Sequence, residues 1–164
     1  MITEHLLSFT IVVIIQLAFF IFHALAVGEG HKILSYLWKG MALGLPFGII
    51  FDLLIGKVVG IYDYEIGFIW WFLIINGIFS FGFMIANVFL LQHHSLLHVL
   101  TWSSGLGIVY ELTNYYFPVW EWTFATNPIL ELVIVVFAGY FGLVAIMMAC
   151  MRLLYKFHFR LLLF

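Results

Sequence analysis

Apolar residues run through this chain in stretches long enough to cross a lipid bilayer, and this pattern limits its fold more than any other feature. Hydrophobic residues make up 66% of the sequence and charged residues 9%, whereas an ordinary soluble domain carries about 25% charged residues. A span needs about 20 apolar residues and must satisfy its own backbone hydrogen bonds, which favours helices. The 164 residues therefore predict one all-α domain, 1–164, that forms an integral membrane bundle of five transmembrane helices.

The five helices are expected where the apolar runs lie. Their ranges are Leu6–Val27, Leu37–Ile55, Gly67–Leu91, Ser95–Tyr116 and Pro128–Tyr155. The N-terminal run has no basic segment before it and no small-residue cleavage site, so we interpret it as a retained span.

Lysine and arginine are distributed unevenly over the connections, and cytoplasmic loops carry an excess of these residues. One side of the predicted bundle has a single basic residue, Lys57, and the other side has the rest: Lys32, Lys39, Arg152, Lys156 and Arg160. This asymmetry predicts a multi-pass protein with its N-terminus outside and its C-terminus in the cytoplasm.

Two segments of the chain repeat one plan. In the first, Gly48 stands four residues before Asp52, and Tyr62, Asp63 and Tyr64 follow after a short gap. In the second, Gly107 stands four residues before Glu111, and Trp120, Glu121 and Trp122 follow. We interpret helices two and three, and helices four and five, as a hairpin duplicated in parallel orientation.

Asp52 and Glu111 are the main candidates for chemistry because they lie inside apolar helices. An ionised carboxylate at bilayer depth costs at least about 2.5 to 3.5 kcal/mol on insertion scales. Each acid is therefore expected to be protonated, paired or solvated by a cavity. A second acid nearby raises a carboxyl pKa, so a pair of such acids supplies a proton donor at neutral pH.

Aromatic residues surround both acids in the sequence and are candidates for binding a substrate. Ring faces stabilise a nearby cation by roughly 2 kcal/mol or more when desolvated, and a protonated alkene is such a cation. The alternative is the belt of Tyr and Trp that membrane proteins place at the lipid interface. The candidate substrate-binding residues are Tyr62, Tyr64, Tyr110, Trp120 and Trp122.

Four further polar residues are secondary catalytic candidates. Asn114 follows Glu111 by three residues on one helical face, so it is expected to orient that carboxyl group. Asp63 and Glu121 are the acids within the two aromatic triplets. Glu131 follows Pro128 in the first turn of the last helix. The helix dipole stabilises a negative charge at that position, so Glu131 is also expected to cap the helix.

Small residues at four-residue spacing predict close packing of helices, because they let membrane helices approach. Such stripes occur on the second, fourth and last helices: Gly40, Gly44, Gly48 and Gly56; Ser103 and Gly107; Ala138, Gly142, Ala145 and Ala149. We expect the second and fourth helices to meet there and to bring Asp52 next to Glu111. The same stripes also suit a homo-oligomer or a separate helix partner.

Histidine is the remaining metal-binding residue type of interest. His94 and His98 lie one helical turn apart and are weak candidates for metal ligands, since a catalytic metal usually takes at least three protein ligands. The motifs of zinc proteases, serine hydrolases, P-loops and calcium loops are absent from the sequence. No cofactor is expected, and with a net charge of -2 no nucleic-acid partner is expected either. Cys150 is the only cysteine, which rules out an internal disulfide.

The acid followed by a Gly-Ile-aromatic-x-aromatic element resembles the lycopene cyclase domain of carotenoid biosynthesis. The matching pieces are Asp52 with GIYDY, and Glu111 with PVWEW and then NPILEL. The resemblance covers about half of the chain and lacks that family's proline followed by two adjacent acids. It implies a membrane-embedded, non-redox cyclisation of an acyclic carotenoid, started by a carboxyl proton donor. The C-terminal half is also similar to bacterial multi-span membrane proteins of uncharacterised function.

Three functions remain open on the sequence alone. The first is an isoprenoid- or carotenoid-modifying enzyme that uses Asp52 and Glu111, with a hydrophobic isoprenoid or membrane lipid as its partner. The second is a proton- or cation-conducting protein, with acids at one end and histidines at the other. The third is a non-catalytic accessory subunit. A shared cavity that opens to lipid favours the enzyme, a continuous wet path favours conduction, and a sealed pair of acids favours a structural role.

Overall fold

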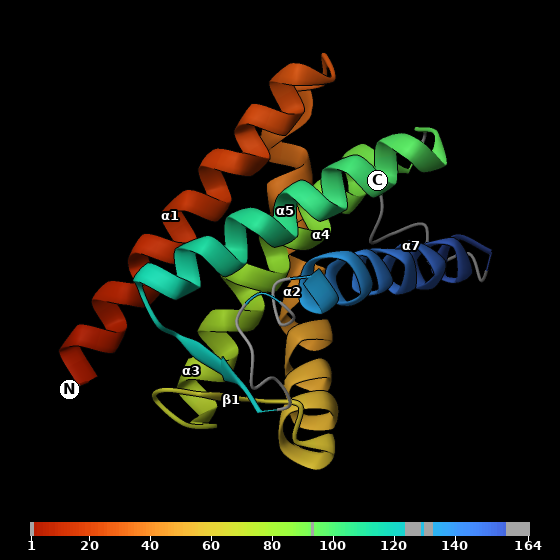
Figure 1. The fold of residues 1–164 in the computed structure, drawn as a ribbon. Coiled ribbons are helices and arrows are strands. Elements are labelled where there is room, and N and C mark those ends of the chain that lie inside the picture. Colours follow the sequence, from red (N-terminus) through yellow and green to blue (C-terminus); the bar gives the residue numbers. More distant parts are fainter. Residues whose placement is uncertain (1, 93, 124–128, 130–132, 157–164) are drawn as a thin grey trace.

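The computed structural model describes residues 2–92, 94–123, 129 and 133–156. Within these residues the chain forms five helical rods and one short pair of strands (Figure 1). The first three rods are α1 (Ile2–Ala26); η1 (Gly30–Lys32) with α2 (Ile33–Phe51) and η2 (Asp52–Val59); and α3 (Trp70–Asn76) with η3 (Gly77–Phe81) and α4 (Gly82–Leu91). The last two rods are α5 (Leu96–Tyr116), and η4 (Ile134–Tyr140) with α7 (Phe141–Lys156). The strands are β1 (Tyr62–Tyr64) and β2 (Trp120–Trp122).

The all-α membrane bundle is confirmed, and the helices lie close to their expected ranges. Four of the rods within the described residues are long and apolar enough to cross a membrane: Thr3–Ala26, Gly30–Val59, Trp70–Leu91 and Ile134–Leu153. α5 is not among these four, and its buried face carries several polar side chains, Glu111 and Asn114 among them. The last helix was expected from Pro128, a position outside the described residues.

Several boundaries differ from the expectation by three or four residues. The first helix starts at Ile2 instead of Leu6, and the second rod ends at Val59 instead of Ile55. The second helix starts at Ile33 instead of Leu37, because η1 leads directly into it. The third starts at Trp70 instead of Gly67, since Gly67 has a positive φ of 77° that ends the preceding turn. The strands were not expected at all, because three residues are too few for an alternating pattern to be recognised.

The rod of α3, η3 and α4 is the centre of the molecule. In α4 every residue is buried, whereas most of the surface of α1 and α2 points outward. Large apolar side chains remain exposed on the outer rods, such as Leu34, Trp38 and Val58. An apolar surface of this kind suits contact with lipid.

The glycines of α2 pack against the central rod and not against α5, so the expectation that they join helices two and four is wrong. A Cβ added to Gly44 would come within 2.4 Å of the Gly82 backbone nitrogen, and one added to Gly40 within 2.3 Å of the Gly82 oxygen. Gly107 on α5 instead receives the ring of Tyr140 from η4. Glycine packing therefore joins each acid-bearing helix to the helix that follows the next strand.

The small residues of the last helix behave differently from those of α2. Ala138, Ala145 and Ala149 are exposed, and a Cβ added to Gly142 would meet no atom within 4 Å. This stripe is not used inside the described part of the fold. Whether it receives a helix partner or a second copy stays a prediction.

β1 and β2 form an antiparallel ribbon in which the two aromatic triplets pair with each other. The register sets Tyr62 against Trp122, Asp63 against Glu121 and Tyr64 against Trp120. The first residue of each triplet thus faces the last residue of the other. Any antiparallel pairing in register has this property, so the duplication of the hairpin stays a prediction.

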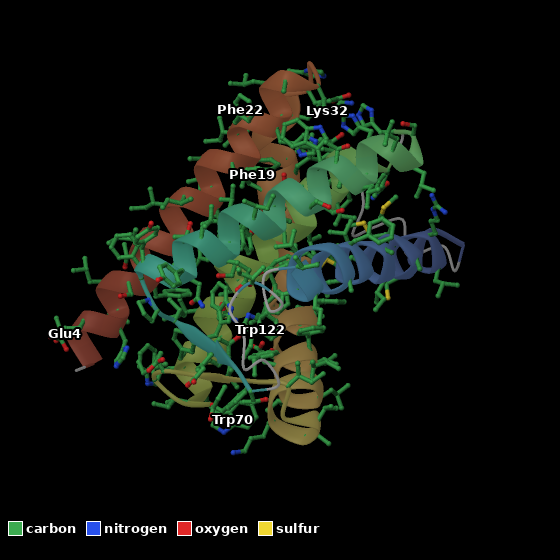
Figure 2. The ribbon with its side chains drawn as sticks, in the orientation of Figure 1. Glu4, Phe19, Phe22, Lys32, Trp70 and Trp122 are labelled. Atoms are coloured by element: carbon green, nitrogen blue, oxygen red, sulfur yellow. The ribbon has the colours of Figure 1, made fainter. Side chains whose placement is uncertain are left out.

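The two ends of the molecule differ in their polar residues. Figure 2 shows Glu4 and Trp70 toward one end and Lys32 at the other, with Trp122 among the elements between them. The ribbon, with Asp63 and Glu121, lies toward the Trp70 end (Figure 1). His23 and His98 lie together elsewhere, with their ring centroids 6.0 Å apart. Which end faces the cytoplasm stays a prediction.

Candidate functional site

Asp52 is fully buried and is surrounded by hydrogen-bond donors. The hydroxyls of Tyr62 and Tyr64 donate to its Oδ1 at 2.5 and 2.7 Å, and Asn76 Nδ2 donates to its Oδ2 at 3.1 Å. Asn76 Nδ2 also lies 2.7 Å from the Tyr64 hydroxyl. A carboxylate that accepts several hydrogen bonds is stabilised in its charged form. These donors thus offset part of the cost of burying the acid.

The two tyrosines of β1 keep their protons over the whole physiological range. Burial, followed by the nearby Asp52, raises the pKa of Tyr62 and of Tyr64 well above 10. Both hydroxyls therefore remain available as donors, and each can pass a proton between Asp52 and a group beside it.

Glu111 is also buried, with 8% of its surface exposed, and a parallel set of donors holds it. Trp122 Nε1 donates to Oε2 at 2.9 Å, and the Tyr140 hydroxyl donates to Oε1 at 2.9 Å. In each half of the repeat, the last residue of the aromatic triplet donates a hydrogen bond to the acid on the preceding helix: Tyr64 to Asp52, and Trp122 to Glu111. The two halves of the repeat therefore build their acid sites in one way.

Segments of π-helix occur at each of these positions. Asp52 opens η2, Asn76 directly precedes η3, and Tyr140 closes η4. A π-helical turn adds a residue to the helix and is frequently found at functional sites. The extra residue rotates the side chains beyond the π-helical segment relative to those of the adjoining α-helix. Asp52, Asn76 and Tyr140 all lie at such junctions.

One cavity of about 210 Å³ joins the two acid sites. Its wall includes the donors to Asp52 (Tyr62, Tyr64 and Asn76) and the donors to Glu111 (Trp122 and Tyr140). Most of the remaining wall is apolar or aromatic: Phe51, Ile55, Ile61, Phe81, Met84, Tyr110, Trp120, Val135, Gly139 and Leu143, with Gln16 and Ser80 as polar members. All five aromatic residues that the sequence indicated for substrate binding therefore line a single cavity.

The carboxyl groups meet through their donors and not directly. Asp52 bonds Tyr62, Glu111 bonds Trp122, and these two rings are cross-strand neighbours with centroids 5.5 Å apart. The expected direct pairing of Asp52 with Glu111 is thus replaced by pairing of their aromatic partners. Neither acid is itself part of the cavity wall, so each reaches a ligand through a hydroxyl or indole group.

The cavity reaches the surface beside the last rod. Gly139 lines it and is exposed, and Leu143, one turn further, lines it and is half-buried. Both residues belong to the candidate span Ile134–Leu153. If this candidate span crosses the bilayer, an opening at this position would face lipid.

Asn114 does not orient the Glu111 carboxyl group by a hydrogen bond, contrary to the expectation. Its Oδ1 accepts from the backbone nitrogens of Val119 and Trp120, and its Nδ2 donates to the Trp120 oxygen. The side chain instead fixes the turn from α5 into β2. It acts on Glu111 only by placing Trp122.

The other secondary candidates lie away from the cavity or outside the described residues. Asp63 and Glu121 oppose each other on the exposed face of the ribbon, and Asp63 Oδ1 accepts from the Tyr64 backbone nitrogen. Like charges directly opposite each other do not stabilise a strand pair, so this face is suited to water. Glu131 is outside the described residues.

His23, His94 and His98 lie close together on α1 and at the start of α5. The rings of His94 and His98 stack at 4.1 Å, and His23 stacks on Trp102 at 3.9 Å and bonds Asn87 through Nδ1. Among the described residues no three His, Cys, Asp or Glu side chains come together as a metal site would require. His94 and His98 are therefore not developed further as ligands.

Tyr140, a partner of Glu111, and Asn76, a partner of Asp52, are not among the candidates chosen from the sequence. Each lies in the helix that follows one of the aromatic triplets. For Asn76 the sequence did offer a signal, since a polar side chain in a span is costly unless paired.

No known protein family, curated protein or solved structure matches this chain.

Proposed function

We propose that this chain is a membrane enzyme that binds an isoprenoid, or a similarly apolar molecule, in the aromatic cavity and isomerises or cyclises it by acid–base chemistry. The observation that carries the proposal is that donors to both buried acids, Asp52 and Glu111, line one cavity. The lipid-facing opening supports a substrate that arrives from the bilayer.

The size and lining of the cavity suit part of an isoprenoid chain. An apolar cavity of about 150 Å³ holds one benzene molecule, so 210 Å³ accommodates a ring or a short branched segment. Tyr62, Trp120 and Trp122 line this space. They would stabilise a carbocation by roughly 2 kcal/mol or more for a good desolvated contact.

The proposed reaction needs no oxidant or reductant. A proton adds to one alkene carbon and leaves the other carbon cationic; a second double bond of the same molecule attacks this cation and closes a ring. A base then removes a proton from the carbon beside the new cation, so the product is an isomer of the substrate. A proton from Asp52 would reach the alkene through the Tyr62 or Tyr64 hydroxyl, and Glu111, behind Trp122 and Tyr140, forms the second acid–base group.

Product analysis in living cells tests the proposal. The chain is expressed in one host that accumulates lycopene and in a second that accumulates an acyclic hydroxylated carotenoid. We expect a new pigment of unchanged mass in at least one host. The pigment should be lost with Asp52→Asn and with Glu111→Gln, and retained with the exposed control variants Asp63→Asn and Glu121→Gln.

Unchanged pigment in the lycopene host rejects the lycopene cyclase activity that the resemblance implies. Unchanged pigments in both hosts contradict the acid–base proposal for carotenoids as a class.

One observation favours proton conduction as a second candidate. Buried polar side chains continue from the cavity toward the histidines at matching intervals: Gln16 and His23 on α1, and Ser80 and Asn87 on the central rod. Ser104 on α5 is buried as well, with a hydroxyl that has no partner among the described residues. Such a series could hold water between the cavity and the histidine cluster.

Proton flux into proteoliposomes distinguishes the two candidates. Conduction predicts a flux that falls with Asp52→Asn and with His23→Leu, whereas the enzyme proposal predicts no flux above that of empty vesicles. A flux that neither substitution changes removes conduction through this path.

A further inference from the structure

The wall of the aromatic cavity contains polar groups that the protein leaves unpaired. Gln16, with 1% of its surface exposed, has no partner for either amide atom among the residues that the structure describes, and Tyr110, 2% exposed, has none there for its hydroxyl. Ser80 Oγ and Trp120 Nε1 are likewise buried without a partner among the described residues. All four residues line the same cavity.

Such a concentration of unpaired groups is unusual for a purely structural core. More than about nine in ten buried polar groups in proteins have a hydrogen-bond partner, and leaving one unpaired costs about 1–3 kcal/mol. A hydrocarbon ligand would leave all four groups unpaired. These residues therefore indicate that a ligand brings a polar atom into the cavity.

The types of the unpaired atoms restrict that polar group to an acceptor. The Trp120 indole and the Gln16 amide nitrogen can only donate, and the hydroxyls of Ser80 and Tyr110 can donate as well. A quaternary ammonium group has no lone pair to accept these bonds. A carbonyl or hydroxyl oxygen accepts them, and a hydroxyl can also donate to Gln16 Oε1.

The charge of the surroundings excludes an anionic group. Asp52 and Glu111 lie directly behind the cavity wall, and the lysine and arginine side chains are absent from the residues that line it. A carboxylate or phosphate would meet two acid side chains and, among the described lining residues, no cation, so its desolvation would not be compensated.

We propose that the ligand of this cavity is an apolar isoprenoid-type molecule with a neutral hydroxyl or carbonyl oxygen, and that Gln16 and Tyr110 determine the specificity for that oxygen. This inference rests on the proposed function in using the same cavity. It adds that the oxygen-bearing molecule is preferred over its hydrocarbon analogue.

Paired retinoids test the preference, because retinol and its deoxy hydrocarbon axerophtene share one carbon skeleton. Energy transfer from tryptophan to the polyene is measured for the purified protein in lipid nanodiscs. We expect retinol to bind saturably and at least about tenfold more tightly than axerophtene, which corresponds to the loss of about one well-formed hydrogen bond.

The variants Gln16→Met and Tyr110→Phe are expected to reduce the preference to less than about threefold, whereas Tyr115→Phe, at an exposed position of the same helix, retains it. Gln16→Met is also expected to raise the unfolding temperature of the ligand-free protein, since it removes two unpaired polar atoms. This second measurement separates a ligand role from a structural one.

Equal affinity for retinol and axerophtene in the wild-type protein would overturn the inference and leave the cavity as a hydrocarbon site, as the proposed function allows. A preference unchanged in Gln16→Met and Tyr110→Phe would remove these residues as its cause. Absence of saturable binding by either retinoid would contradict the inference and the proposed site together.

Discussion

Asp52 places a carboxyl group with no exposed surface against three hydrogen-bond donors, Tyr62, Tyr64 and Asn76. At the residue scale, the stability of this end of the molecule depends on that acceptor. If it is removed, buried donors lose their partner, and each unpaired donor costs about 1–3 kcal/mol.

We expect Asp52→Leu to lower the free energy of unfolding by several kcal/mol, because the hydroxyls of Tyr62 and Tyr64 then have no acceptor. Asp52→Asn retains one oxygen and should lose less. Thermal unfolding in detergent measures both, with exposed Asp63→Asn as a control expected to stay within about 0.5 kcal/mol of wild type. Equal stability of Asp52→Leu and Asp63→Asn would contradict the donor arrangement.

The raised pKa of Tyr62 and Tyr64 predicts a pH dependence of stability. The folded protein keeps both protons while the unfolded chain loses them near pH 10, so the unfolded state binds fewer protons above that pH. The contribution of the two tyrosines to the free energy of unfolding is therefore complete below about pH 10 and declines as the pH rises further.

Phenolate absorbance measures this directly. Folded wild type and the double variant Tyr62→Phe, Tyr64→Phe should gain the same phenolate signal up to about pH 11. A larger signal in the wild type near pH 10 would show that these tyrosines titrate normally and would contradict their burial.

The sequence indicated the two buried acids and their aromatic neighbours, but not every partner of these acids. An acid inside a span stands out because its burial is costly, so Asp52 and Glu111 could be selected, and the repeat indicated their aromatic neighbours. Tyr140 could not be selected, since an aromatic residue on an apolar helix has many equally good positions. Asn114 was assigned to the wrong partner because helical spacing takes no account of the backbone of β2.

At the scale of elements, the contact between α2 and the central rod decides how the first acid is placed. Gly44 and Gly82 let the two backbones approach more closely than any side chain would permit. Overpacking of a tight contact costs typically about 1–3 kcal/mol.

Gly44→Ala should therefore destabilise the protein by about that amount, although alanine is the better helix former by about 1 kcal/mol. Gly142→Ala on α7 meets no atom within 4 Å and should be neutral or stabilising. Thermal unfolding of the two variants side by side checks the contrast. If both variants are stabilised, the close contact of α2 with the central rod is wrong.

The glycine spacing predicted close helix contacts but not which helices make them. Spacing identifies the face of a helix, whereas the partner helix depends on how the chain connects the helices. Here the helix that follows each strand packs against the helix that precedes that strand. The ribbon was missed for a related reason. Its three-residue strands are held by cross-strand pairing and by Asn114, neither of which leaves a periodic pattern.

At the scale of the whole molecule, the distribution of Lys and Arg predicts that the ribbon faces the outside and the α1–α2 connection faces the cytoplasm. Single cysteines at Asp63 and His31, in a Cys150→Ser background, test this in intact cells. A membrane-impermeant maleimide should label Asp63→Cys and not His31→Cys. The reverse labelling pattern would invert the topology.

We place the ligand in the single cavity between the donors to Asp52 and the donors to Glu111. Two glycines of the last rod give matched positions to test it. Gly139 lines the cavity, and a Cβ there meets only ordinary contacts near 3.9 Å, while Gly142 lies away from the cavity wall with nothing within 4 Å.

The most direct measurement is therefore retinol binding, followed by tryptophan energy transfer, to wild type, Gly139→Phe and Gly142→Phe in nanodiscs. We expect saturable binding to wild type and to Gly142→Phe, and its loss in Gly139→Phe, because the phenyl ring would occupy the cavity. Binding to folded Gly139→Phe with wild-type affinity would contradict it.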